Sequence, residues 1–357
     1  MTATTIRPGT QDLSEGVLGM ALLDIERGDL PTVQLHLAQA TALGVSTGGN
    51  ASLFHGAPAL EFVLSRAGHP GSDLRDAVNR VVDARLAAAR RRQASGALPH
   101  LAEWDLIRGL AGLGALLLTR RAATPRLEEV LGYLVSLSRP TRTGGRSVPG
   151  WWSAVGPGGE QMEGGHGNNG IAHGIAGPLA VLSLADRHDI QVPGQHEAIE
   201  VFARWLDTYG GCYWVTRVHL DAVEPPEPEP ARQSWCYGKP GIARAQQLAA
   251  LALGEPARRQ AAEDTLVHTL TDRAHLARIT DATVCHGWAG ILALARAVAA
   301  DSPAPERFTA VIHDLKQRLA ADLELLPKPG FMEGRAGAQL ALDGTNTTGW
   351  TSALLIT

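Results

Sequence analysis

The chain has 357 residues and 45% hydrophobic content, which is enough for a large core arranged as one big domain or two ordinary ones. The 32 Lys and Arg residues nearly balance the 36 Asp and Glu residues, and the formal net charge of -4 gives no sign of nucleic-acid binding or of a polybasic membrane anchor. The N-terminus lacks the apolar stretch of a secretory signal, and no apolar run is long enough to cross a bilayer. Three cysteines are too few for a disulfide framework in a chain of this length. We therefore expect a cytoplasmic protein with reduced thiols.

One short element recurs along the whole chain. It is a Gly-x-x-Gly or near-Gly motif followed by an apolar stretch, and its first glycines are Gly16, Gly56, Gly109, Gly174, Gly238, Gly287 and Gly334. The gaps of 40, 53, 65, 64, 49 and 47 residues each leave room for two helices and their connections. An aromatic content of only 5% beside 40 glycines also favours closely packed helices over a β-sandwich.

Amphipathic segments lie between the apolar stretches. Three of them have apolar residues at the spacing of one helical face: Leu74, Val78, Val81 and Val82; Leu127, Val130, Leu131, Leu134 and Val135; and Phe308, Val311, Ile312, Leu315 and Leu319. Thr124 and Pro125 provide a cap and a first-turn proline for the second. The stretches over residues 176–184 and 289–298 are apolar nearly all round, which is typical of buried helices.

Buried helices that alternate with amphipathic helices seven times predict an all-α fold. We expect a single domain over residues 1–357, an α/α toroid of seven helical hairpins with an inner and an outer ring, because a repeat unit cannot bury its apolar face alone. An open helical solenoid is the alternative. The paired glycines are expected to gather at one end, where they let the chain turn tightly into each inner helix.

Two stretches interrupt the pattern. Residues 139–170 are rich in Gly, Pro and Trp, and residues 210–232 contain a strand-like GGCYWVTRV followed by a Pro/Glu tract, residues 224–229, that cannot be helical. Both precede repeats that carry reactive side chains, so we interpret them as loops that shape the mouth of a site. Surface insertions without a role are the alternative.

Three repeats carry the Cys and His residues that we consider as site candidates, one or two positions before the first glycine. Repeat five reads SWCYGKPG with Cys236, repeat six reads VCHGWAG with Cys285 and His286, and repeat four reads GIAHGIAG with His173. If the repeats are structurally equivalent, these side chains share one rim of the ring. Cys212 lies outside the repeat element, so we expect it to be structural or exposed.

Two thiolates and one imidazole can bind zinc and leave its fourth position open, which is typical of a catalytic site. Because two thiolates already cancel the charge of the ion, the site would stabilise a bound thiolate better than it would polarise a carbonyl. The sequence therefore predicts zinc on Cys236, Cys285 and His286, used to activate a thiol. The alternative is a pair of ordinary buried cysteines beside a helix-capping histidine.

Other polar residues near the rim have less specific signals. His173 could be a fourth ligand, but we prefer it as a general acid or base, because a fourth protein ligand would close the site. Asp105 lies four residues before Gly109 and could orient a histidine or a substrate, or only cap a helix. Arg232 could bind a substrate carboxylate or pair with Asp105.

The motifs GIAHGIAG, SWCYGKPG and CHGWAG together closely resemble the signature motifs of the lanthionine synthetase C family, the LanC-type lanthipeptide cyclases. The resemblance covers essentially the whole chain and implies an α/α toroid with one zinc ion. The site residues that it implies are the zinc ligands Cys236, Cys285 and His286, the acid/base His173, the functional Asp105, and Tyr237, Trp235 and Arg232 lining the site.

The resemblance also implies the reaction, in which Cys thiols of a dehydrated precursor peptide add to dehydroalanine or dehydrobutyrine and form lanthionine or methyllanthionine rings. Whether His173 takes the thiol proton or protonates the enolate stays open. No kinase or lyase region precedes the toroid, so a separate dehydratase is expected. The alternatives are a related protein that binds glutathione or adds it to dehydroamino acids, and a non-catalytic scaffold with structural zinc.

Overall fold

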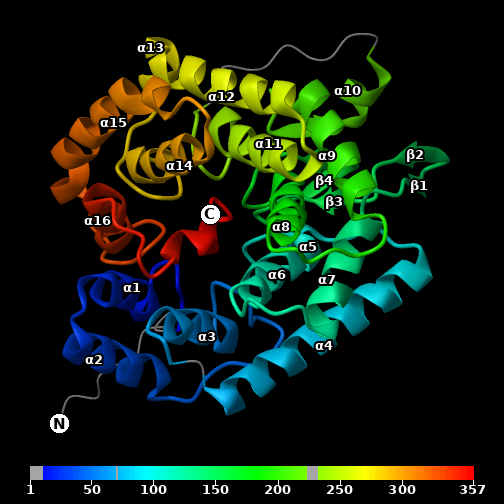
Figure 1. Cartoon of the computed structure of the whole chain (residues 1–357). Coiled ribbons are helices and arrows are strands. Elements are labelled where there is room, and N and C mark those ends of the chain that lie inside the picture. Colours follow the sequence, from blue (N-terminus) through cyan, green and yellow to red (C-terminus); the bar gives the residue numbers. More distant parts are fainter. Residues whose placement is uncertain (1–10, 70, 223–231) are drawn as a thin grey trace.

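The computed structural model describes residues 11–69, 71–222 and 232–357, and its helices form two concentric rings (Figure 1). Each of the seven glycine elements leads into a helix of the inner ring. These inner helices are α1 (Val17–Arg27), α3 (Ala57–Arg66), α6 (Leu110–Leu118), α8 (Ala176–Arg187), α11 (Lys239–Leu253), α14 (Trp288–Asp301) and α16 (Arg335–Asp343).

The outer ring covers the inner one. Its helices are α2 (Leu30–Thr41), α4 (Ser72–Ser95), α7 (Pro125–Ser136), α9 (Gln195–Tyr209), α12 (Pro256–Thr271) and α15 (Thr309–Asp322). Shorter helical segments join them: α5 (Leu101–Trp104), α10 (Arg217–Asp221), α13 (Arg273–Leu276), η1 (Pro305–Phe308) and η2 (Leu323–Leu325). The three predicted amphipathic stripes lie on α4, α7 and η1–α15, and Thr124 caps α7 by accepting a hydrogen bond from the Leu127 amide at 3.2 Å.

The ring is closed, because α1 packs against α16. The predicted α/α toroid is therefore confirmed, and the open solenoid is excluded. The seventh repeat differs from the other six: within the described residues, α16 is followed by a 3-10 turn, η3 (Trp350–Leu354), in place of an outer α-helix. The tail that follows η3 ends in the middle of the ring (Figure 1), where the Arg244 guanidinium donates to the Ile356 carbonyl at 2.9 Å.

The second glycine of each element allows a close backbone approach, as expected. In six repeats, an added Cβ would lie under 3.0 Å from the carbonyl oxygen of the residue six positions earlier; the glycines are Gly19, Gly112, Gly177, Gly241, Gly290 and Gly337. Repeat two has Ala59 at this position, and its chain enters α3 through Gly56 at a φ of 71°, a left-handed conformation that favours glycine.

The prediction of loops over residues 139–170 was wrong in part, because this stretch contains four short strands. They are β1 (Thr141–Thr143), β2 (Arg146–Val148), β3 (Ser153–Val155) and β4 (Gln161–Asn168). Gly144 and Gly145 both have positive φ and form the two-residue turn between β1 and β2. The strand-like GGCYWVTRV forms β5 (Trp214–Thr216), which pairs with β4 in an antiparallel sheet of order β3-β4-β5.

The Pro/Glu tract over residues 224–229 lies outside the described residues. Among the helices that the structure does describe, none combines the length and the apolar character that crossing a bilayer requires.

Candidate functional site

The loops that lead into the inner helices meet at one end of the ring and bind one another through their backbones. The Cys236 amide donates to the Cys285 carbonyl at 3.4 Å, and the Cys285 amide donates to the Met332 carbonyl at 2.9 Å. On the other side, the Leu106 amide donates to the Ala172 carbonyl at 3.1 Å. These bonds bring together residues that are 47 or more positions apart in the sequence.

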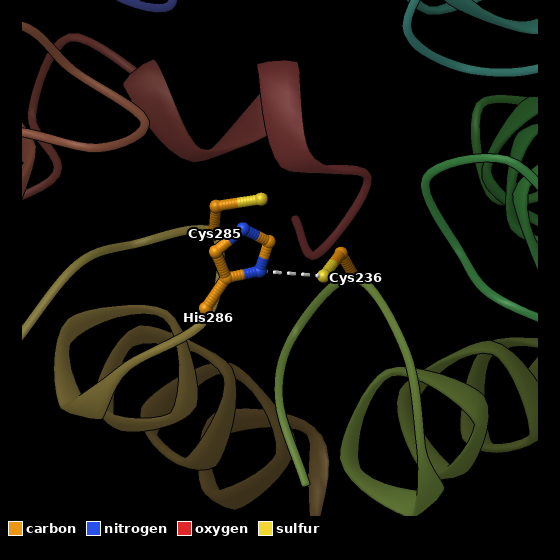
Figure 2. Close-up of side chains that lie close together, drawn as sticks. All are labelled: Cys236, Cys285 and His286. Carbon is orange, nitrogen blue, oxygen red and sulfur yellow. Dashed lines mark hydrogen bonds between the residues drawn. The ribbon is translucent and has the colours of Figure 1, made fainter. Parts of the chain in front are cut away.

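The three predicted ligands lie together at this rim (Figure 2). The Sγ atoms of Cys236 and Cys285 and one ring nitrogen of His286 are all within 4.8 Å of one another, and the Nδ1 atom of His286 is 3.2 Å from the Cys236 sulfur. Cys236 is buried, whereas Cys285 and His286 are partly exposed. The group could therefore hold a metal ion that a substrate can reach from one side.

Hydrogen bonding favours a thiolate in this group. The Cys285 thiol lowers the pKa of Cys236 well below its usual range, and the imidazole of His286 acts in the same direction. The other nitrogen of His286, Nε2, is 4.0 Å from a carboxylate oxygen of Glu333, which in turn pairs with Lys328 at 2.6 Å. Glu333 can thus orient the imidazole so that Nδ1 faces the sulfur atoms.

His173 and Asp105 form a hydrogen-bonded pair. The Nδ1 atom of His173 is 2.7 Å from Asp105 Oδ2, and the other oxygen of Asp105 accepts a hydrogen bond from the Arg108 amide at 2.7 Å. Asp105 is fully buried, while 22% of the His173 side chain is exposed. Because Nδ1 is held by the carboxylate, Nε2 is the nitrogen available to a substrate. Asp105 thus both caps the turn before α6 and orients a histidine.

Tyr237 lies between these two groups. Burial raises the pKa of its phenol well above the usual value, and the charges of Cys236 and Asp105 are both near enough to add to that shift. The phenol therefore stays protonated at neutral pH. Its oxygen accepts a hydrogen bond from the amide of Asn168 at 2.8 Å, so the hydroxyl hydrogen is free to point elsewhere.

Asn168 was not singled out from the sequence. It is fully buried at the end of β4, and its Oδ1 accepts a hydrogen bond from the Gly170 amide at 3.1 Å. The signal in the sequence was the polar stretch HGNNG directly before the His173 motif. Asn169 in the same stretch is also fully buried and accepts a hydrogen bond from the Trp205 indole at 2.7 Å. The polar side chains of this stretch form hydrogen bonds that connect the sheet to Tyr237 and to Trp205 of α9.

Arg232, Trp235 and Cys212 differ in how close they lie to the Cys₂His group. Arg232 lies close to the sulfur group: hydrogen bonding to Cys236 raises the pKa of Cys285, and the charge of Arg232 opposes that rise. Of the two roles considered for Arg232, the pair with Asp105 is not formed, and the carboxylate of Asp105 binds His173 instead. Trp235 was expected to line the site, but its side chain is fully buried and its indole donates to the Leu354 carbonyl at 3.0 Å. Cys212 is half-buried and lies outside the donor set.

The fold and the rim define a closed α/α toroid with a Cys₂His group able to bind a metal and a neighbouring Asp–His pair. The sequence matches the family described as lanthionine synthetase C-like protein over residues 7–355. The chain therefore belongs to the lanthionine synthetase C-like family. Among solved structures, nisin cyclase has the same fold, with a TM-score of 0.77 and 18% sequence identity over 98% of this chain and 92% of that one. No curated protein matches the sequence.

Proposed function

We propose that this protein is a zinc-dependent lanthipeptide cyclase. It adds Cys thiols of a dehydrated precursor peptide to dehydroalanine or dehydrobutyrine, which produces lanthionine or methyllanthionine thioether rings. The observation that carries the proposal is the Cys₂His group at the rim of a toroid of this family, with the Asp105–His173 pair beside it. The activity, the zinc ion and the catalytic roles given below are all parts of this proposal.

The donor set suits zinc. Ligand atoms about 2.0–2.3 Å from a tetrahedral zinc ion lie roughly 3.3–3.8 Å apart, which is compatible with three donors that are all within 4.8 Å of one another. Cys236, Cys285 and His286 would hold the ion and leave one position for a substrate. When bound there, zinc would lower the pKa of a substrate thiol toward neutrality.

The residues of the chain then handle the protons. His173 Nε2 takes the proton of the substrate thiol, or gives a proton to the product carbanion, and Asp105 holds the ring in position for either step. The sulfur lone pair forms a bond to the β-carbon of the dehydroamino acid, the carbon–carbon double bond breaks, and its electron pair moves to the α-carbon. That carbon takes up one proton, so the addition is balanced without an oxidant or reductant.

Tyr237 and Arg232 support the negative charge that develops on the substrate. The Tyr237 hydroxyl is neutral, and its oxygen already accepts from Asn168, so its hydrogen can be donated to the carbonyl oxygen of the enolate. Arg232 is the cation near the thiolate group and would attract the anionic form of the substrate.

The remaining predictions from the sequence complete the proposal. The cyclase occupies residues 1–357 as one domain, acts in the cytoplasm, and receives a peptide that a separate dehydratase has prepared, because thiol addition requires an existing dehydroamino acid.

The test uses a synthetic peptide that contains one dehydroalanine and one Cys, with free thiols counted by alkylation. Zinc-loaded protein is expected to consume the thiol without a change in peptide mass. The Cys236→Ala variant should lose the zinc and the activity, whereas Cys212→Ala should retain both. If metal-loaded protein leaves the thiol count unchanged, cyclase activity on this peptide is refuted. If it instead adds glutathione to the same peptide, the glutathione-adding alternative is supported.

A further inference from the structure

A cavity lies at the opposite end of the ring from the Cys₂His group. It has a volume of about 520 Å³ and is lined by the last turns of α3, α6 and α8 and by the loop between α16 and η3. His173 precedes α8 and His188 follows it, and the 12 residues of this helix span roughly 18 Å. The cavity is therefore separate from the proposed active site.

The lining of this cavity is basic. It includes Arg66, Arg121 and His188, and none of the described residues that line it has an acidic side chain. Arg121 lies close to both other basic side chains: burial lowers the pKa of Arg66 and of His188, and the charge of Arg121 adds to both shifts. Asp189, beside His188, opposes the shift of that histidine only in part.

The basic side chains lie at helix C-termini, but binding to the free carbonyl groups there does not account for all of them. Basic side chains often bind the free carbonyl groups of a helix C-terminus. At the end of α6, however, backbone amides of residues 119–121 already bind the carbonyls of residues 116–118. Within the described residues, the guanidinium of Arg121 makes no ion pair, so its charge is available to a ligand.

The loop that closes the cavity is held in place before any ligand binds. Glu26 of α1 accepts hydrogen bonds from the amides of Thr347 and Thr348 at 2.7 and 3.0 Å. The Gly349 carbonyl accepts a hydrogen bond from Arg66 at 3.3 Å, and an added Cβ at Gly349 would lie 2.8 Å from that guanidinium. A preformed site of this kind loses little entropy when it binds a ligand.

Backbone strain is concentrated around the same cavity. In the described residues, the non-glycine positions with positive φ are Arg121 (52°), Asp189 (57°) and Leu355 (56°). Arg121 and Leu355 line the cavity, and Asp189 follows His188, which also lines it. Left-handed backbone at ordinary residues is costly and tends to occur at ligand-binding sites. Here the left-handed backbone places the cation of Arg121 and the apolar side chain of Leu355 at the same cavity.

We propose that this cavity binds a small organic anion that has a phosphate or carboxylate head and an apolar body. The head would lie against Arg66, Arg121 and His188, because a guanidinium binds either oxyanion with paired N–H groups. The apolar body would lie on Leu118 and Leu184, which line the same space. A volume of about 520 Å³ suits a small molecule better than a single inorganic ion.

The test is calorimetric titration of the zinc-loaded full chain in low-salt buffer with inorganic phosphate, hexyl phosphate and hexanoate. Hexyl phosphate or hexanoate should bind at least about tenfold more tightly than inorganic phosphate, because the chain buries apolar surface. The tighter of the two identifies the preferred head group. Arg121→Gln should weaken binding by about tenfold or more, since it removes a charged hydrogen-bond donor.

His188→Gln is the second variant, and Arg204→Gln on the exposed face of α9 is the matched control, which should bind like the wild type. Thermal unfolding and zinc content of each variant should match the wild type, which separates loss of this site from loss of the fold or of the metal centre. The proposal is overturned if none of the three probes binds at millimolar concentration, if inorganic phosphate binds as tightly as the two organic anions, or if both variants bind like the control.

Discussion

Gly290 connects the fold to the Cys₂His group, and its replacement by alanine tests that connection. An added Cβ would overlap the Val284 carbonyl oxygen and would lie 3.0 Å from the Trp235 Cβ. Val284 precedes Cys285, and Trp235 precedes Cys236, so a methyl group at this one position pushes on the loops that carry both thiols. We therefore expect Gly290→Ala to disturb metal binding although it touches no ligand directly.

The size of the effect follows from two opposing terms. The overlap is with backbone, which cannot rotate away, so the overpacking cost lies near the upper end of the usual range, about 3 kcal/mol. Alanine gains about 1 kcal/mol over glycine from its higher helix propensity. The net loss in the free energy of unfolding is therefore about 2 kcal/mol. Displaced thiolates should weaken zinc binding by roughly tenfold or more, as changes next to metal ligands do.

Chemical denaturation and competition with a zinc-binding dye measure the two effects. Gly132→Ala is the matched control, because Gly132 lies on the exposed side of α7 and an added Cβ there has nothing within 4 Å. That variant should be as stable as the wild type or up to about 1 kcal/mol more stable. The reasoning is refuted if Gly290→Ala binds zinc like the wild type, or if the two variants lose stability equally.

Three further predictions concern the site. Asp105→Asn should retain zinc but react about 10–100-fold more slowly, because an amide cannot hold His173 in the tautomer that leaves Nε2 free; equal rates would contradict the dyad. Asn168→Leu should lower the rate about tenfold at unchanged zinc content, and an unchanged rate would remove Asn168 from the site. Burial raises the pKa of the Tyr237 phenol above its usual value of 10.0, so the folded state favours the neutral phenol. The stability that this phenol contributes to the folded protein is therefore fully present below pH 10.0 and is lost as the pH rises through the raised pKa. An ultraviolet difference titration against Tyr237→Phe should show no ionisation of this phenol below that pH.

Much of the fold was predictable because its unit is short and repeated. The seven glycine elements determined where the inner helices begin, and the stripes on α4, α7 and η1–α15 determined which faces are buried. The strands over residues 141–168 were missed because they are short and contain many glycines, so neither alternation nor β-branched residues stood out. The missing seventh outer helix could not be predicted from the repeat itself, since the tail fills the ring only after closure.

The Cys₂His group was predictable for the same reason, since Cys236 and Cys285 occupy equivalent places in neighbouring repeats. The contacts of the other site residues were harder to foresee. The sequence alone does not distinguish an Asp105 that caps a helix from an Asp105 that orients His173. In the structure, one carboxylate oxygen accepts from the Arg108 amide and the other is bonded to His173, so Asp105 has both roles. The hydrogen bond from Asn168 to Tyr237 joins the inserted sheet to a repeat loop. Because the inserted sheet is not part of the repeat, the repeat pattern of the sequence could not predict this contact.

The arrangement of the rim explains how a repetitive fold can support one asymmetric site. Each repeat presents the residue before its first glycine at the same end of the ring, and the repetition sets only the position of that residue, not its type. In three neighbouring repeats this residue is His173, Tyr237 or His286, and in the proposed mechanism these would serve as proton carrier, neutral hydrogen-bond donor and metal ligand. At the ring closure, Glu333 and Glu15 share Lys328 in an ion-pair network, with Nζ–O distances of 2.6 Å to each. Closure of the toroid thus places Glu333 next to His286, so a contact made for the fold can also orient a side chain of the Cys₂His group.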